Sequence, residues 1–298
     1  MTAHTGTPQI GLGLPPDILR VGRQTLQALV AAINQSAITH VAVSDHVSFR
    51  GGGGWDALTA MAVLSGLGID RPLHAGVFIL PVRHPTILAR QLLDLADVHE
   101  HEIVAGVGLG GDDPDEYAMV GLDSRERGRL MDDALPLLRR LLRDEGAIDV
   151  GGRYQARGAG LARGSGQPVR VLVGGRSPQA HQRAAESDGW LATFCSPDRF
   201  SECRSRMVEA SGESLTVGYQ AWVGVGDRRA VDAAIARFYG LDPAPFARYT
   251  PAGSPNDIAD DIRPYVDAGA NLVHLFAAAD HPLDAVTAVS AVANMLSA

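Results

Sequence analysis

Short apolar segments alternate along the chain with longer segments in which apolar residues recur at helical spacing. Eight of the apolar segments have the length and composition of strands buried on both faces, as in a parallel sheet covered by helices. They comprise residues 9–14, 40–44, 73–80, 102–109, 168–174, 189–195, 216–225 and 271–277. The intervening segments predict helices at residues 24–33, 56–67, 86–96, 125–143, 178–185, 197–209, 229–239 and 283–296.

Eight strand–helix units in one chain predict an α/β fold, a closed (β/α)₈ TIM barrel, as a single domain over residues 1–298. An open doubly wound sheet is the alternative, since the same alternation of elements builds both folds. Longer spacings indicate insertions after the fourth and seventh strands. The first insertion, residues 146–167, is rich in Gly and Arg, which is typical of a surface loop. A role in shaping the substrate site is the second interpretation.

Composition narrows the classes of function. The 298 residues carry 26 basic and 34 acidic side chains, a formal net charge of −8, and every basic residue is Arg because the sequence has no Lys. The absence of Lys excludes Schiff-base enzymes, pyridoxal-phosphate enzymes and the Walker-type phosphate loop. An acidic chain without a basic stripe also argues against nucleic-acid binding.

The composition also predicts the cellular compartment. Two Cys residues are too few for a disulfide framework and fit a reducing compartment. The first ten residues lack the pattern of a signal peptide, and no segment approaches the roughly 20 apolar residues that a membrane span needs. These features predict a cytoplasmic protein that binds no membrane.

Candidate chemistry follows the predicted strands, because barrel enzymes carry their catalytic groups at the C-terminal ends of the strands. Asp45 and His46 follow the second strand, where a carboxylate beside an imidazole can orient the ring and move a proton near neutral pH. A cap or turn is the plainer interpretation of this dipeptide. Residues 174–177 follow the fifth strand, and their glycines, arginine and N-capping serine are suited to a phosphate. An ordinary capped turn is the alternative there.

Three further patterns give weaker evidence for a functional site. The glycines of residues 106–111 would allow close approach of a flat ligand, but they do not match the dinucleotide fingerprint. His-Glu-His-Glu at residues 99–102 has the residue types of a metal site but precedes the fourth strand, at the opposite face of a barrel. We interpret it as a solvated loop and predict no metal site. Cys195 ends the sixth strand, and we interpret it as an inert thiol rather than a nucleophile.

Several of these motifs together resemble the luciferase-like monooxygenase superfamily. They are SDH at residues 44–46, LPVRHPTILARQLLDLADV at 80–98, GVGLG at 106–110, EYAMVGLDSRERGRLMDDALPLLRRLL at 116–142 and VGGRSPQAHQRAAESDGWL at 173–191. The likeness covers almost the whole chain. It implies a (β/α)₈ barrel that binds either FMN or the deazaflavin coenzyme F420 at the barrel mouth.

Asp-His after the second strand resembles the F420-dependent branch of this superfamily. The resemblance implies that Asp45 contacts the ring system and that His46 lies beside the site of hydride transfer. It further implies a non-proline cis peptide bond at Val77–Phe78, in a bulge that presses on the cofactor ring. The residues to which it assigns cofactor contacts are Asp45, Val77, Phe78, Gly108, Gly110, Gly174, Gly175, Arg176 and Ser177.

One departure limits the choice of substrate. Some F420-dependent sugar dehydrogenases of this superfamily carry an acidic residue directly after the glycines of the fourth strand and a Lys near the substrate. This chain has Gly111 at the first position and no Lys at all, which argues against that sugar-phosphate activity.

The leading hypothesis is therefore an F420-dependent oxidoreductase that transfers a hydride between the cofactor and a small organic substrate. His46 would donate or accept the accompanying proton. The second hypothesis is an FMN-dependent luciferase-like monooxygenase that uses O₂ and reduced flavin from a separate reductase. The third is a non-catalytic barrel that binds the deazaflavin. The resemblance also implies a homodimer, and the sequence does not identify the substrate.

Overall fold

Eight parallel strands form a closed barrel in the computed structural model, which describes residues 7–16, 18–49, 54–110, 113–144, 146–162, 164, 166–211 and 215–297. In their order around the barrel, these strands are β1 (Gln9–Leu14), β2 (Val41–Val43), β3 (Leu73–Ile79), β4 (Ile103–Gly108), β7 (Val169–Gly174), β8 (Gly189–Thr193), β9 (Thr216–Val225) and β11 (Leu272–Ala278). Strand β8 pairs with β9, and β11 pairs with β1, so the sheet closes on itself. Closure confirms the predicted (β/α)₈ barrel and excludes the open sheet.

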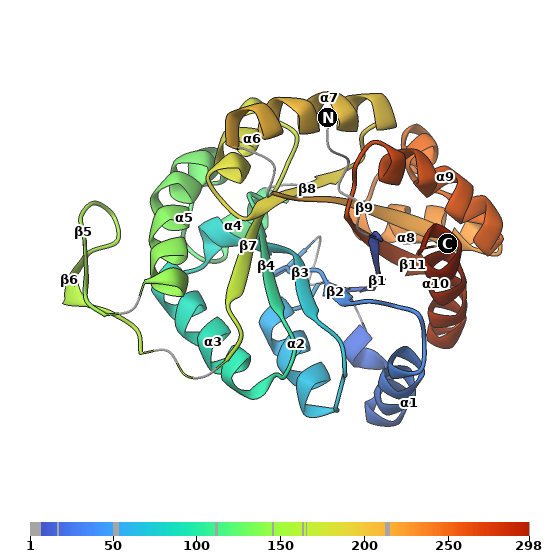
Figure 1. Cartoon of the computed structure of the whole chain (residues 1–298), viewed down its shortest axis with the longest axis horizontal. Helices are drawn as coiled ribbons and strands as arrows, with labels where there is room; N and C mark the ends of the chain where they lie inside the picture. Colours follow the sequence, from blue (N-terminus) through green and yellow to red (C-terminus); the bar gives the residue numbers. More distant parts are fainter. Residues whose placement is uncertain are drawn as a thin grey trace.

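Helices surround the strands on their outer side (Figure 1). They are α1 (Arg23–Asn34), α2 (Ala57–Gly66), α3 (Pro85–Val98), α4 (Pro114–Ala118), α5 (Arg127–Arg143), α6 (Pro178–Ala185), α7 (Pro197–Ser211), α8 (Arg228–Tyr239), α9 (Pro255–Asp267) and α10 (Pro282–Ser297). The described residues also form short 3₁₀ helices, which are η1 (Ile18–Val21), η2 (Leu80–Val82), η3 (Ser124–Glu126) and η4 (Ala244–Tyr249). Within the described part of the chain, no helix combines the length and apolar character of a membrane span.

Local sequence signals explain where several helices begin. Ser177 caps α6 by accepting a hydrogen bond from the backbone of Ala180, and Asp56 caps α2 in the same way. Helix α9 begins with a capping box between Ser254 and Asp257, followed by Pro at the first helical turn. The predicted helices leave out α9 and the short α4, although both start with these signals.

The insertion after β4 forms a small antiparallel hairpin of β5 (Ile148–Val150) and β6 (Ala156–Ala159). Figure 1 shows the hairpin standing off the barrel beyond α3 and α5. Arg90 of α3 donates to the backbone oxygen of Ala162, which ties the segment after β6 to the outer helix layer. None of the described residues of this insertion lines the cavity at the barrel mouth, in agreement with a surface segment and against a role in shaping the site.

The interior of the barrel divides into an apolar and a polar part. Four side chains from β4, β7, β8 and β11 pack together as one apolar cluster: Val104, Leu172, Leu191 and Leu272. The other part holds buried His40, His74 and His274. Near them, Arg170 binds both carboxylate oxygens of Glu102 and reaches Thr216. The interior of the barrel therefore contains a polar cluster beside its apolar one.

Candidate active site at the barrel mouth

A cavity of about 410 Å³ opens at the C-terminal ends of the strands. One side is built from the ends of β2, β3, β4 and β7, and the other from β9, β11 and helix α8. The lining residues are Ser44, Asp45, His46, Gly76, Val77, Ile79, Gly108, Leu109, Gly110, Arg127, Gly174, Gly175, Arg176, Ser177, Ala180, Thr193, Gln220, Ala221, Trp222, Phe238, Tyr239 and Phe276. All predicted site residues except Phe78 are among them. Gly111 lies outside the described residues.

Strand β3 carries the expected bulge, but the cis peptide bond is Gly76–Val77 rather than Val77–Phe78. The prediction was wrong by one residue. The register with β4 explains the difference: Ala75 pairs with Ala105 and Phe78 with Val107, so the extra residue falls at Gly76 and Val77. Phe78 has already returned to the regular ladder and is fully buried in the main core.

The strand-four glycines make room for this bulge. A Cβ added to Gly108 would lie 2.7 Å from Cγ2 of Val77, and one added to Gly106 would lie 2.1 Å from the backbone oxygen of Ala75. On the adjacent strand, a Cβ on Gly174 would lie 3.3 Å from Cγ1 of Val77. These glycines therefore let Val77 project across the ends of β4 and β7 into the cavity.

The turn after β7 has the features of an anion-binding site. Gly175 has φ +130°, a backbone conformation that favours glycine, and it precedes the N-terminus of α6. The hydroxyl of Ser177 accepts from the backbone N–H of Ala180 at 3.1 Å. Two guanidinium groups, those of Arg127 and Arg176, line the cavity beside this turn. The turn thus combines backbone N–H groups, the positive end of a helix dipole and cationic side chains.

Asp45 is engaged almost entirely by the protein. Its Oδ1 accepts from the backbone N–H of Ala57 at 3.0 Å, and its Oδ2 accepts from that of Ile79 at 3.1 Å. Arg83 binds both oxygens of the same carboxylate, with Nε to Oδ2 at 3.0 Å, and also donates to Asp56 at 2.8 Å. Burial opposes the charge of Arg83, but the carboxylates of Asp45 and Asp56 together outweigh it, and the pKa of this guanidinium is raised. The carboxylate therefore joins β2, α2 and the end of β3.

His46 is held by a buried carboxylate that the sequence analysis did not assign to the site. Nδ1 of His46 lies 3.1 and 3.2 Å from the two carboxylate oxygens of Glu116, whose side chain is fully buried. Oε1 of Glu116 also accepts from the backbone N–H groups of Val47 at 2.6 Å and Ser48 at 3.3 Å. Because Nδ1 faces Glu116, the imidazole has its Nε2 left for a ligand.

The start of α4 could have been found from the sequence, although the contact of Glu116 with His46 could not. Asp113 accepts from the backbone N–H of Asp115, and Pro114 occupies the first helical turn, so the Asp-Pro pair marks a helix N-terminus. The short helix turns Glu116 back toward β2. The spacing of 70 residues from His46 gives no pattern in the sequence, so their contact is visible only in the fold.

The side of the cavity opposite the glycines is aromatic. Trp222 of β9 donates through Nε1 to the Tyr239 hydroxyl at 3.2 Å and packs against Phe276, with ring centroids 5.7 Å apart. Phe238 meets the edge of His46 at 5.2 Å between centroids. Tyr239 and Phe238 come from the end of α8, so the segment after the seventh barrel strand does contribute to the site.

The remaining candidate residues have structural partners. His99 is buried, with Nε2 near the backbone oxygen of Arg71 at 3.1 Å, and His101 contacts Asp70 at 2.6 Å. The interpretation as a solvated loop was thus wrong for His99. Cys195 and Cys203 line a separate smaller cavity of about 240 Å³. Burial raises the pKa of the Cys195 thiol to about 11, which favours the unreactive thiol form.

Comparison with known sequences agrees with the resemblance noted above. A family model described as luciferase-like monooxygenase matches residues 19–250. An uncharacterized protein of Mycobacterium tuberculosis is 29% identical over 138 residues, which is 46% of this chain and 48% of that protein. The chain spans about half the length of the curated relatives it matches.

Solved structures share the fold at low sequence identity. An F420-dependent secondary alcohol dehydrogenase, in complex with an F420–acetone adduct, superposes with a TM-score of 0.79 at 13% identity and covers 95% of this chain and 97% of its own. The oxygenating constituent of 3,6-diketocamphane monooxygenase from Pseudomonas putida, in complex with FMN, gives 0.68 at 16% identity, with 98% of both chains covered. The same barrel is thus found with either cofactor.

Proposed function

Because the chain belongs to the luciferase-like monooxygenase family, we propose that it is an F420-dependent oxidoreductase that transfers a hydride between the deazaflavin and a small organic substrate. The observation that carries the proposal is the His46–Glu116 pair at the cavity. Hydride transfer to or from a carbonyl or alcohol carbon requires a proton transfer at the neighbouring oxygen. An imidazole oriented by a buried carboxylate is suited to that proton.

The cavity residues fit a cofactor with a planar ring and a phosphate. Gly174, Gly175, Arg176 and Ser177 would hold the phosphate, since they combine helix N–H groups with a guanidinium. Val77 and the backbone of Gly108 and Gly110 would support the ring. When bound, F420 supplies the carbon that accepts or donates the hydride.

The protein's own residues perform the remaining tasks. Glu116 keeps Nδ1 of His46 hydrogen-bonded, so that Nε2 is the atom that gives up or takes the substrate proton. Asp45 acts through Arg83 and the end of β3, and holds the bulge beside the cavity rather than moving a proton. Trp222, Phe238 and Phe276 exclude water from the opposite side and favour an apolar substrate.

FMN-dependent oxygenation is the second candidate, because FMN also carries a planar ring and a phosphate that the bulge and the turn after β7 could contact. In that reaction, reduced flavin from a separate reductase would be consumed together with O₂. A barrel that binds the deazaflavin without turnover is the third. We further propose a homodimer located in the cytoplasm, and sedimentation velocity tests the dimer.

The deciding experiment is equilibrium titration of the purified protein with F420 and, separately, with FMN, followed by fluorescence. We expect micromolar or tighter binding of F420 and much weaker binding of FMN. The variant His46→Gln should bind F420 with unchanged affinity and lose about 100-fold or more in turnover of an alcohol or ketone panel. Preference for FMN with oxygen uptake would overturn the F420 assignment, and full turnover by His46→Gln would overturn the role of His46.

A further inference from the structure

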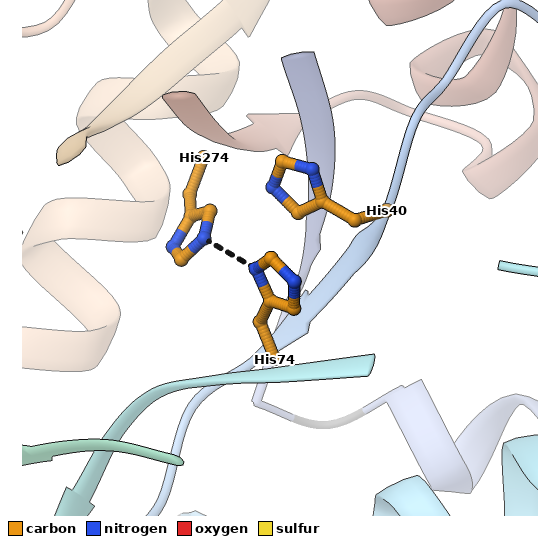
Figure 2. Close-up of side chains that lie close together, drawn as sticks. All are labelled: His40, His74 and His274. Atoms are coloured by element: carbon orange, nitrogen blue, oxygen red, sulfur yellow. Dashed lines mark hydrogen bonds between the residues drawn. The ribbon is translucent and has the colours of Figure 1, made fainter. Parts of the chain in front are cut away.

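Three histidines far apart in the sequence meet inside the barrel (Figure 2). His74 lies on β3 and His274 on β11, and His40 directly precedes β2. Their exposed fractions are 1%, 0% and 1%, respectively. The proposed function uses none of them, and their burial has a cost that requires an explanation.

The three rings converge. Nδ1 of His74 lies 3.2 Å from Nε2 of His274. His40 stacks on His74 with ring centroids 4.2 Å apart and meets His274 edge-on at 5.0 Å. In Figure 2 His40 turns one ring nitrogen toward the His74–His274 pair. One nitrogen from each ring can be chosen so that all three lie within 4.8 Å of one another.

The surroundings determine which nitrogen of His40 is free. The Thr39 hydroxyl donates to the backbone oxygen of Ile10 at 3.0 Å, so toward Nδ1 of His40, 2.9 Å away, it can only accept. His40 therefore carries its proton on Nδ1 and a lone pair on Nε2. Nε2 is fully buried and has no hydrogen-bond partner in the described part of the chain.

On its outer side, His274 faces Gln220. Its Nδ1 and Oε1 of Gln220 both lack hydrogen bonds among the described residues. Both atoms face the same space beside Gly76, where a Cβ would lie 3.2 and 3.0 Å from them, respectively. An N–H on Nδ1 of His274 directed at Gln220 leaves Nε2 as the lone pair that faces His74. Such hydrogen bonds from the non-ligating nitrogen are what orient metal-bound histidines.

We propose that His40, His74 and His274 bind one first-row transition metal ion of the zinc type inside the barrel. Three neutral imidazoles without a carboxylate suit Zn²⁺, Co²⁺ or Cu and not Mg²⁺ or Ca²⁺. Burial lowers the pKa of each ring, and that of His274 to about 3, so all three have a lone pair available at neutral pH. The nearby Arg170 charge is compensated by Glu102.

Three imidazoles leave the fourth position of a tetrahedral ion to a water molecule, and the three ligands connect strands of the barrel. Gln220 separates the site from the cavity, and the three ligands join β2 and β3 to β11 across the strand β1, whose Gly11 lies against Nε2 of His40. Nitrogen–metal bonds of about 2.0–2.1 Å in tetrahedral geometry set the nitrogens roughly 3.3 Å apart. Metal binding therefore draws His40 closer to the pair. Since the ligands are enclosed, the ion enters during folding and is released slowly.

The test measures metal and not activity. Protein without a polyhistidine tag is dialysed against EDTA, and its metal content is determined by inductively coupled plasma mass spectrometry. A second sample is unfolded in guanidinium chloride and refolded with one equivalent of Co²⁺. We expect about one ion per chain in both samples and the visible d–d absorption of tetrahedral Co²⁺ in the second.

Variants locate the ligands. His274→Gln and His40→Gln should each lower the retained metal at least tenfold, whereas His46→Gln should retain it, because it removes the cavity imidazole and leaves the cluster intact. Less than a tenth of an ion per chain in both wild-type samples would overturn the proposal, as would full retention by folded His274→Gln. If the variants do not fold, X-ray absorption of the Zn²⁺-refolded wild type decides: three imidazole ligands support the site, and a shell of oxygen ligands overturns it.

Discussion

At the scale of single residues, the site depends on a buried carboxylate, that of Glu116, which positions the imidazole of His46 at the cavity. Glu116 has no exposed surface, yet it fixes His46 at the cavity through Nδ1 and fixes the following backbone through Val47 and Ser48. Three hydrogen-bond donors share one carboxylate, so the position of the imidazole and that of the loop are coupled.

Replacing Glu116 tests this coupling. Glu116→Gln keeps the shape of the side chain but loses the charge-assisted contact with His46, so we expect kcat to fall about 10-fold to 100-fold. The Kd of F420 should stay within about twofold, since Glu116 does not line the cavity. Asp115→Asn on the exposed face of the same helix is the control and should match the wild type. An equal loss of kcat in both variants would mean that activity depends on the integrity of α4 and not on the Glu116 carboxylate.

A second residue-scale prediction concerns the room that Val77 needs. In Gly108→Ala, the new Cβ would lie 2.7 Å from Cγ2 of Val77, so Val77 must move into the cavity. We expect an affinity loss for the cofactor of about tenfold, together with about 1–3 kcal/mol lower stability from overpacking. Gly151→Ala, where nothing lies within 4 Å, is the matched control. Unchanged affinity, measured by the same fluorescence titration, would show that Val77 does not bear on the cofactor.

At the scale of secondary-structure elements, one ion pair connects two strands and a helix. Asp45 links the end of β2 to the N-terminus of α2 and to the bulged end of β3, and Arg83 closes the arrangement. Asp45→Ala leaves the Arg83 charge buried without its main partner, and we expect about 3–5 kcal/mol lower free energy of unfolding. Asp56→Asn keeps a residue that can cap α2 and removes only the charge that faces Arg83; since this side chain is 42% exposed, the change should cost less than about 1 kcal/mol. Urea unfolding of the two variants distinguishes this structural role from the ring contact that the resemblance implies.

The elements also show why the sequence predicted the barrel better than its mouth. Strands such as β2 and β4 are continuous apolar runs because both of their faces are buried, and this pattern can be recognised in the sequence alone. Helix α4 has five residues and is too short to show a helical period. The hairpin of β5 and β6 is mostly exposed, so its residues do not alternate between apolar and polar. Asp45, His46 and residues 174–177 could be placed because each follows a strand. Glu116 and the three histidines could not, since their neighbours come from strands or helices distant in sequence.

At the scale of the whole molecule, a buried thiol and buried tyrosine hydroxyls on several elements make the free energy of unfolding depend on pH in the alkaline range. Burial raises the pKa of Cys195 from its ordinary 9.0 to about 11 and that of Tyr265 from 10.0 to about 12. The Tyr265 hydroxyl donates to the backbone oxygen of Cys195 at 2.6 Å, and its ring stacks on Tyr219 at 3.7 Å between centroids. The pKa of Tyr219 is also raised, mainly by burial. These groups connect β8, β9 and α9.

The direction of the effect follows from proton binding. The folded state keeps these protons to higher pH than the unfolded state, so the unfolded state binds fewer protons between the two pKa values. The stabilisation is complete below about pH 9, and for Cys195 it is lost as the pH rises toward about 11. Each group lowers the free energy of unfolding by at most about 1.4 kcal/mol per pH unit in its window.

Urea unfolding measured at several pH values above neutrality checks this expectation. We expect the midpoint to fall steadily above about pH 9, and the fall to be shallower in Cys195→Ala, which removes one of the linked protons. Arg125→Gln, at a side chain that is 88% exposed and is not among the charges acting on Cys195, serves as the control, with an unchanged slope. In the same pH range, native Cys195 should react slowly with iodoacetamide, because its thiolate is populated chiefly after unfolding. A flat pH profile with rapid labelling of the native protein would contradict both parts, and would mean that the segment joining β8 to α7 opens without global unfolding.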